Sequence, residues 1–199
     1  MKPSNKSRGN LSKLRSLPFF TAAEARKMGI EAASLAYYVR KHFFKRVGRG
    51  VYRNPEIETG IDIQWEDLVI IAATIPRGVI CLISALSIYN LTEEVMRQYW
   101  IATPNRMTAP RRPKAKIIRM RNMTLGRTEM EFGDYKIKIF DRERTVVDSF
   151  RYLSRETAIK ALKSYLKGSN EHRPNIEKLR SYAKKLRVPL DPYILATTT

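Results

Sequence analysis

Two glycines separated by one arginine, in the stretch FKRVGRGVYR at residues 44–53, impose the tightest local constraint on how this chain can fold. Glycine adopts positive φ at little steric cost, so Gly48 and Gly50 predict a sharp reversal of the backbone around Arg49. The flanking FKRV and VYR segments are rich in β-branched and aromatic residues, as short strands are. The stretch therefore predicts a small β-hairpin with an arginine at its tip.

Helices are predicted before this hairpin. Leucines three residues apart predict a short amphipathic helix over residues 11–17, which Pro18 ends. Thr21 as N-cap and Glu24 three residues later form a capping box, and Gly29 is a natural end for the helix that begins there. The sequence thus predicts two helices ahead of the segment that leads into the hairpin.

A third helix is predicted over residues 30–44, with Leu35, Val39 and Phe43 one turn apart and facing the core. Helix, helix-turn-helix and hairpin in this order predict a winged helix-turn-helix domain. In that fold the third helix enters the DNA major groove and the hairpin lies against phosphates or the adjacent minor groove. The candidate DNA-contacting residues are Ser34, Tyr37, Tyr38, Arg40, Lys41, Arg46 and Arg49. For each of them taken singly, core packing or a solvated charge is the alternative.

The charge of the chain favours a polyanionic partner. Lysine and arginine total 38 against 19 aspartate and glutamate residues, which gives a net charge of +19 and a pI near 10.3. The excess is uneven, because residues 97–127 hold nine basic and no acidic side chains. A second phosphate-contacting surface is predicted there, with a solvated loop as the alternative; its residues are Arg111, Arg112, Lys114, Lys116, Arg119 and Arg121. In an extended segment Arg119 and Arg121 share a face that Lys116 does not.

A polar connector over residues 54–62 predicts a domain boundary, with a winged helix-turn-helix domain at residues 1–56 and a mixed α/β domain at residues 61–199. The fold class expected for the chain is thus α+β. In the second domain, helices are predicted over residues 63–76, 142–153, 157–168 and 175–187, strands over 98–104, 115–122 and 135–141, and a buried strand leading into a short helix over 78–92. The tail at residues 196–199 is expected to be frayed.

The sequence offers little support for catalysis. One cysteine, Cys81, excludes an internal disulfide and any zinc site built on paired cysteines, so a reducing, cytoplasmic setting is expected. Neither a signal peptide nor a membrane span is expected, because the apolar runs are short. Only Glu131, Asp134 and Lys136 are similar to the carboxylate-x-Lys pattern of metal-dependent nucleases. We therefore expect no enzymatic activity, no metal and no cofactor, with a metal-dependent nucleic-acid-processing enzyme as the alternative.

Four motifs in order resemble the AbiEi-type antitoxins of type IV (AbiE) abortive-infection systems. They are RVGRGVYRNP at residues 46–55, ISALSIYNLT at 83–92, YWIATP at 99–104 and IKIFDRERTVVDSF at 137–150. The resemblance implies a bacterial protein that binds inverted repeats in its own promoter and represses its operon. It also implies that the second domain counteracts a nucleotidyltransferase-like toxin, with no stable antitoxin–toxin complex required. Monomeric and dimeric binding to double-stranded DNA both stay open.

The same resemblance gives possible functional roles to Arg144, Thr145 and Asp148 in the last motif. The residues themselves favour a structural interpretation, in which Asp141 or Thr145 caps a helix and Arg144 or Asp148 forms a local ion pair. A further alternative is that the basic strands of the second domain bind RNA, for example the tRNA substrate of the toxin. The sequence does not separate RNA from DNA at those strands.

Overall fold

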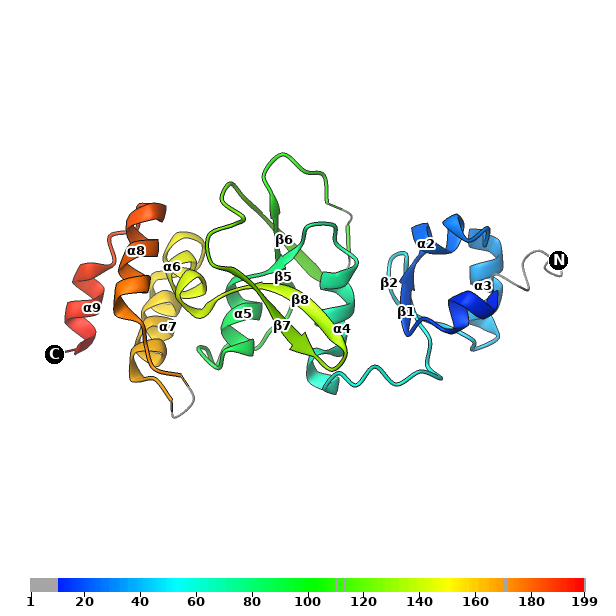
Figure 1. The fold of residues 1–199 in the computed structure, drawn as a ribbon, viewed down its shortest axis with the longest axis horizontal. Helices are drawn as coiled ribbons and strands as arrows, with labels where there is room; N and C mark the ends of the chain where they lie inside the picture. The colour runs from blue at the N-terminus through cyan, green and yellow to red at the C-terminus, as the bar shows by residue number, and fades with distance from the viewer. Residues whose placement is uncertain (1–10, 110, 113, 170–171, 199) are drawn as a thin grey trace. The chain divides into compact units, whose positions relative to one another are not determined.

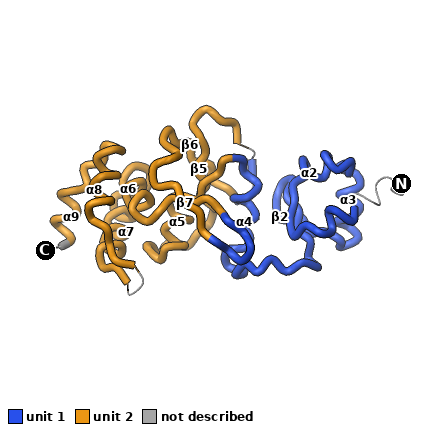
Figure 2. Tube along the Cα trace, viewed as in Figure 1, with its two compact units in different colours: residues 1–76, 110–114, 131–136 blue, residues 77–109, 115–130, 137–199 orange. Residues whose placement is uncertain are grey.

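The computed structural model describes residues 11–109, 111–112, 114–169 and 172–198, and its fold is mixed α+β. The chain forms two compact units, drawn in blue and orange in Figure 2. Unit 1 comprises residues 1–76, 110–114 and 131–136, and unit 2 comprises residues 77–109, 115–130 and 137–199. Across the described part of the chain, no helix is long and apolar enough to cross a membrane.

Unit 1 begins with helices and a small antiparallel sheet (Figure 1). Residues 11–15 are helical, and β1 Phe19–Thr21, α2 Ala22–Lys27, α3 Ala32–Arg40, β2 Lys45–Gly48 and β3 Val51–Arg53 follow. β3 lies in the centre of the sheet, with β1 and β2 antiparallel on either side. The predicted capping box is confirmed, because the Thr21 hydroxyl accepts from the Glu24 amide at 3.2 Å and the Glu24 carboxylate accepts from the Thr21 amide at 2.6 Å.

The predicted hairpin is confirmed between β2 and β3, with Arg49 and Gly50 at its tip. Of its two glycines, Gly50 takes the predicted positive φ, at +70°. Gly48 lies instead where the strand register shifts between Arg46 and Gly48. One glycine therefore turns the chain, and the other stands at a β-bulge, where a residue without a side chain is often found.

Helix α3 is shorter than the sequence predicts. It ends at Arg40, because His42 adopts a left-handed conformation with a φ of 61° that a right-handed helix cannot continue. The Phe43 amide then donates to the Tyr38 carbonyl at 3.0 Å, which closes the end of the helix. This reversal directs Phe44 into the core, where its side chain is 1% exposed.

The core of this region is small and aromatic. Its buried residues are Leu14, Phe20, Ala25, Ile30, Leu35, Tyr38 and Phe44. Phe20 and Phe44 pack edge to face with ring centroids 4.8 Å apart, a favoured aromatic geometry. Because this cluster joins α2, α3 and the sheet, it sets the orientation of α3 relative to the hairpin.

The rest of unit 1 is built around α4 Ile63–Ala73, which lies within the helix predicted over residues 63–76. Its N-cap is Asp62, whose carboxylate accepts from the Gln64 amide at 3.0 Å. Glu66 accepts from Arg53 of β3, with an ion-pair distance of 2.8 Å, and from the Thr59 hydroxyl at 2.9 Å. These contacts lie inside unit 1 and join α4 to the strand that ends the hairpin.

The second half of the chain contains a five-stranded mixed sheet of order β6-β5-β4-β8-β7. The elements are β4 Val79–Ile80, α5 Leu82–Ile88, β5 Tyr99–Pro104, β6 Ala115–Met120, β7 Arg127–Phe132, β8 Tyr135–Phe140, α6 Arg142–Tyr152, α7 Arg155–Lys167, α8 Ile176–Leu186 and α9 Asp191–Thr198. β4 pairs antiparallel with β5 and parallel with β8, while β5 and β6 are parallel. Helix α6 contacts α5, α7 and α8, and an apolar cluster that includes Val147, Leu162 and Leu179 fills the space between them.

The predicted helices and strands of this half are confirmed, and two further elements are present. β7 and α9 are not predicted by the sequence pattern. The tail prediction is wrong for residues 196–198, because α9 continues through Thr198, while Thr199 lies outside the described residues. Ile194 of α9 is buried with the helical cluster, and this packing accounts for order near the end of the chain.

Candidate nucleic-acid interface

One face of α3 presents polar and cationic side chains. Arg40 and Lys41 are exposed at its C-terminal end, and Ser34 and Tyr37 are half-buried on preceding turns. Residues 34, 37 and 41 are three and four apart, so they share one face of the helix. Leu35, at 1% exposure, lies about 100° round the helix from Ser34 and packs into the core. This face offers a hydroxyl, a phenol and cations, which are suitable donors to phosphates and base edges.

The structure corrects one predicted contact on this helix. Tyr38 is 2% exposed and belongs to the core, with its ring centroid 6.1 Å from that of Phe43 and 6.2 Å from that of Phe44. The buried positions of α3 are thus Leu35 and Tyr38, while Val39, which the sequence also predicts on the inner face, is half-buried and packs against the same core. Because a buried ring cannot reach a nucleic acid, Tyr38 is removed from the predicted DNA contacts.

The hairpin adds two exposed arginines to this region. The Arg46 guanidinium donates through Nε to the Gly48 carbonyl at 3.3 Å, within the hairpin itself. Arg49 stands at the tip beside Gly50, and its side chain is exposed. The main chain of the tip is anchored to the neighbouring helix, because the Ala22 amide donates to the Gly50 carbonyl at 2.9 Å. The tip therefore combines a fixed backbone with an exposed cation.

The second basic block is divided between the two units. Arg111, Arg112 and Lys114 belong to unit 1, whereas Lys116, Arg119 and Arg121 belong to unit 2. Pro110 and Pro113, on either side of Arg111 and Arg112 in the sequence, lie outside the described residues. The six cations therefore do not form one surface within a single unit.

The side chains of this block also differ in what they contact. Lys114 forms an ion pair with Asp67 at 2.5 Å. The Lys116 ammonium lies 3.7 Å from the centroid of the Trp100 ring, a cation–π contact. Arg119 on β6 is exposed, and Arg121 is exposed just beyond the end of that strand. Arg119 and Arg121 were predicted to share one face of a strand, but Arg121 lies outside β6, so the prediction does not apply to it.

Arg112 is the member of this block whose position the sequence did not foresee. Its guanidinium is half-buried and donates to the Arg49 carbonyl and to Thr74, at distances of 3.1 to 3.4 Å. Burial lowers the pKa of Arg112. Its donors therefore face backbone and hydroxyl oxygens of unit 1, which does not fit the predicted role as a phosphate contact. No signal in the sequence indicates this pairing, since Arg49 and Thr74 are far away along the chain.

The fragment that is similar to nuclease motifs forms the turn between β7 and β8. Glu131 and Lys136, both exposed, make an ion pair at 3.2 Å. Among the residues that the structure describes, no group of three or more His, Cys, Asp or Glu side chains is placed to hold a metal ion. The side chains of this turn therefore supply no observation in favour of the enzymatic alternative.

The last motif of the resemblance lies at the start of α6, where its side chains hold the fold together. The Asp141 carboxylate caps the helix by accepting from the Arg144 amide at 2.9 Å. Arg144 and Asp148 are both buried and form an ion pair at 2.7 Å. The Thr145 hydroxyl donates to the Phe140 carbonyl at 3.1 Å. These contacts support the structural interpretation of the motif that the residues alone favour.

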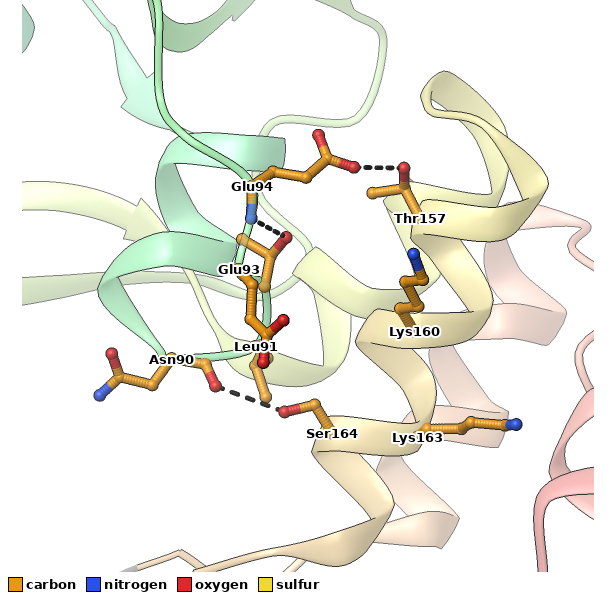
Figure 3. A pocket seen from close by; sticks show the side chains of 9 residues that line it. Asn90, Leu91, Glu93, Glu94, Thr157, Lys160, Lys163 and Ser164 are labelled. Atoms are coloured by element: carbon orange, nitrogen blue, oxygen red, sulfur yellow. Dashed lines mark hydrogen bonds between the residues drawn. The ribbon is translucent and has the colours of Figure 1, made fainter.

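Unit 2 also contains a pocket of about 560 Å³ between residues 90–94 and α7 (Figure 3). Across it the Thr157 hydroxyl donates to Glu94 at 2.5 Å, and the Ser164 hydroxyl donates to the Asn90 carbonyl at 3.3 Å. Figure 3 shows these two contacts joining opposite walls of the pocket. These contacts occupy the Glu94, Thr157 and Ser164 side chains, and we assign no ligand to the pocket.

A helical region with a small sheet, carrying exposed cations on one helix and one hairpin, has the features of DNA-binding regulators. Residues 11–55 match the family described as "Transcriptional regulator, AbiEi antitoxin". This part of the chain is thus an AbiEi antitoxin/transcriptional regulator domain, and the resemblance inferred from the sequence is confirmed over residues 11–55, which include the first of its four motifs. The family description implies DNA binding and a toxin as the functional counterpart. No curated protein matches the chain.

Proposed function

We propose that this protein represses its own operon as a winged helix-turn-helix protein and acts as the antitoxin of a type IV abortive-infection system. The observation that carries the proposal is the polar face of α3 beside the arginine-bearing hairpin, inside a region that matches the AbiEi family. Residues 1–56 are proposed as the DNA-binding domain and residues 61–199 as the antitoxin domain. The toxin is proposed to be nucleotidyltransferase-like, and the protein itself to be a cytoplasmic non-enzyme without cofactors.

In this proposal α3 enters the major groove. Ser34, Tyr37, Arg40 and Lys41 then contact bases and phosphates, and the Arg46 and Arg49 side chains reach the backbone beside the groove. Exposed Arg111, Lys116, Arg119 and Arg121 are candidates for further phosphate contacts. Inverted repeats in the promoter require two copies on the DNA, whether these meet before binding or only there.

Arg49→Ala is expected to weaken binding to the promoter duplex and to lower the slope of log K against log salt concentration by about 1, because one phosphate contact and its released counterion are lost. Titrations of the two proteins against one labelled duplex at several salt concentrations measure this slope. Lys27→Ala, an exposed cation on α2 that is not among the proposed contacts, is the matched control for loss of one charge. An unchanged slope for Arg49→Ala would show that the hairpin does not touch phosphate.

Lys41→Ala and Tyr37→Ala are expected to reduce the preference for the promoter over a scrambled duplex, by about 5- to 100-fold if each residue contacts a base edge. Binding to both duplexes in parallel measures this ratio. The same Lys41→Ala variant should still protect cells that express the nucleotidyltransferase-like toxin, because antitoxin action is assigned to residues 61–199. Loss of both properties in a folded variant would contradict the proposed division of labour.

A further inference from the structure

Arg112 links two elements of unit 1 that are distant in sequence. Its Nη1 donates to the carbonyl oxygen of Arg49 at 3.1 Å, at the tip of the hairpin. Its Nε donates to the Thr74 hydroxyl at 3.2 Å, and its Nη2 to the Thr74 carbonyl at 3.4 Å. One guanidinium group therefore contacts both the hairpin tip and the residue that ends α4.

The Thr74 side of this contact is well defined. Thr74 is the C-cap of α4, and its hydroxyl also donates to the Ile71 carbonyl at 2.9 Å. The carbonyl groups at the end of a helix lack partners within the helix and carry partial negative charge, so they favour a nearby cation. Arginine suits the position because its planar group offers several donors in a fixed geometry, which a lysine ammonium does not.

The Arg49 side of the contact engages only the main chain. Arg112 holds the Arg49 carbonyl, and the Arg49 side chain is left exposed. On the other side of the tip, the Ala22 amide donates to the Gly50 carbonyl. Two consecutive carbonyl groups of the tip are thus held, which fixes the point and direction at which the Arg49 side chain leaves the backbone.

We infer that Arg112 is a positioning residue for DNA binding, which fixes the backbone of the hairpin tip so that Arg49 is presented to a phosphate in advance. The inference rests on the proposed DNA-binding function. Its physical basis is preorganisation, since a tip that is already ordered loses less conformational entropy when DNA binds. The role differs from that of a phosphate contact, because the guanidinium of Arg112 is directed at the protein.

A salt titration with the full chain separates these two roles. Arg112→Ala should weaken binding to the promoter duplex by about tenfold, while the slope of log K against log salt stays that of the unaltered protein. Arg112→Lys keeps the positive charge but loses the planar guanidinium with its several donors, so it should weaken binding to a similar extent. Lys27→Ala, an exposed cation on α2 that is not among the proposed contacts, is the control for removal of one charge.

A double-mutant cycle tests whether Arg112 acts through Arg49. Arg112→Ala should cost little affinity in an Arg49→Ala background, because the side chain that it positions is then missing. Equal losses in both backgrounds, a slope lowered by about 1 in Arg112→Ala, or full activity of Arg112→Lys would each overturn the inference.

A measurement without DNA separates failure of this inference from failure of the proposed function. Hydrogen–deuterium exchange in the free protein should be faster at residues 49–51 in Arg112→Ala than in the unaltered chain, with α3 unchanged. If the promoter duplex is not preferred but exchange at the tip rises, the proposed function fails and the contact itself stands. If exchange at the tip does not change, Arg112 does not hold the hairpin and the inference is overturned.

Discussion

Replacing Arg144 with alanine should lower the free energy of unfolding of unit 2 by about 3–5 kcal/mol, because it leaves a buried carboxylate without its main partner. Arg144 is 0% exposed, and its Nε pairs with Asp148 at 2.7 Å. The same guanidinium donates to the carbonyl groups of Leu125 at 2.8 Å and Asn122 at 3.0 Å. It also lies 4.4 Å from the centroid of the Phe140 ring. The substitution therefore removes these hydrogen bonds, together with the one that Arg144 donates to the Met120 sulfur, and leaves a cavity.

The electrostatics of Asp148 add to this cost. Burial raises the pKa of the Asp148 carboxyl, and the Arg144 and Arg151 guanidinium groups oppose that rise. Without Arg144, only the pairing with Arg151, at 2.8 Å, helps to keep the carboxylate charged inside the protein. Protonation of Asp148 would remove its charge but would not restore the hydrogen bonds that Arg144 makes in the unaltered protein.

Urea denaturation followed by circular dichroism measures the effect of Arg144→Ala. Arg142→Ala is the matched control, since Arg142 lies on the same helix but is only half-buried and stacks on Tyr89. A double replacement of Arg144 and Asp148 by Met and Leu should recover much of the loss, because it removes both buried charges. A loss below about 1 kcal/mol in Arg144→Ala would contradict this account of the motif.

Phe44→Ala should abolish promoter binding at 37 °C by destabilising unit 1, with an expected loss of about 3–5 kcal/mol. Phe44 is 1% exposed and packs edge to face on Phe20 in a core of few residues. Small cores provide little net stability, so a loss of this size is comparable to the whole. The polar face of α3 would then no longer be held beside the hairpin.

Thermal melting and duplex titration of the same Phe44→Ala preparation test this expectation. Phe44→Leu is the control, because it keeps a large apolar side chain and should retain binding with a smaller loss of stability. Unit 2 should melt as in the unaltered protein in both variants. A Phe44→Ala protein that melts and binds normally would show that this aromatic core does not support the candidate interface.

The sequence predicted most elements of the fold because their signals are local. The capping box at Thr21 and Glu24, the hairpin around Gly50 and the helix cap at Asp141 each depend on residues within a few positions of one another. The helices of unit 2 show clear periodicity of apolar residues. Such features can be recognised without knowledge of the tertiary structure.

The predictions that failed concern features that the local sequence pattern does not determine. Helix α3 stops at Arg40 although its pattern continues, because His42 turns the chain and directs Phe44 inward. Tyr38 was predicted as a candidate DNA contact with core packing as the alternative, and the structure places it in the core. The sequence of β7, RTEMEF, shows too little alternation of apolar and polar residues to predict a strand.

The sequence predicted which exposed cations belong to the candidate site, but not the hydrogen bonds that join its parts. The exposed cations of α3 and the hairpin follow from charge and spacing, as Lys41 and Arg49 illustrate. The role of Arg112 could not be predicted, because it depends on the Arg49 and Thr74 oxygens, which only the folded chain brings together. A basic segment read from sequence alone indicates charge, and the structure indicates which charges face the protein.

Fluorescence anisotropy with the duplex upstream of this gene, against a scrambled duplex, tests the central claim most directly. The titrations are done in EDTA at two salt concentrations, so that no divalent metal contributes. The account predicts a preference of about a hundredfold or more for the upstream duplex, maintained at the higher salt. Equal binding to both duplexes that collapses with salt would contradict sequence-specific repression and leave only non-specific attraction to phosphate.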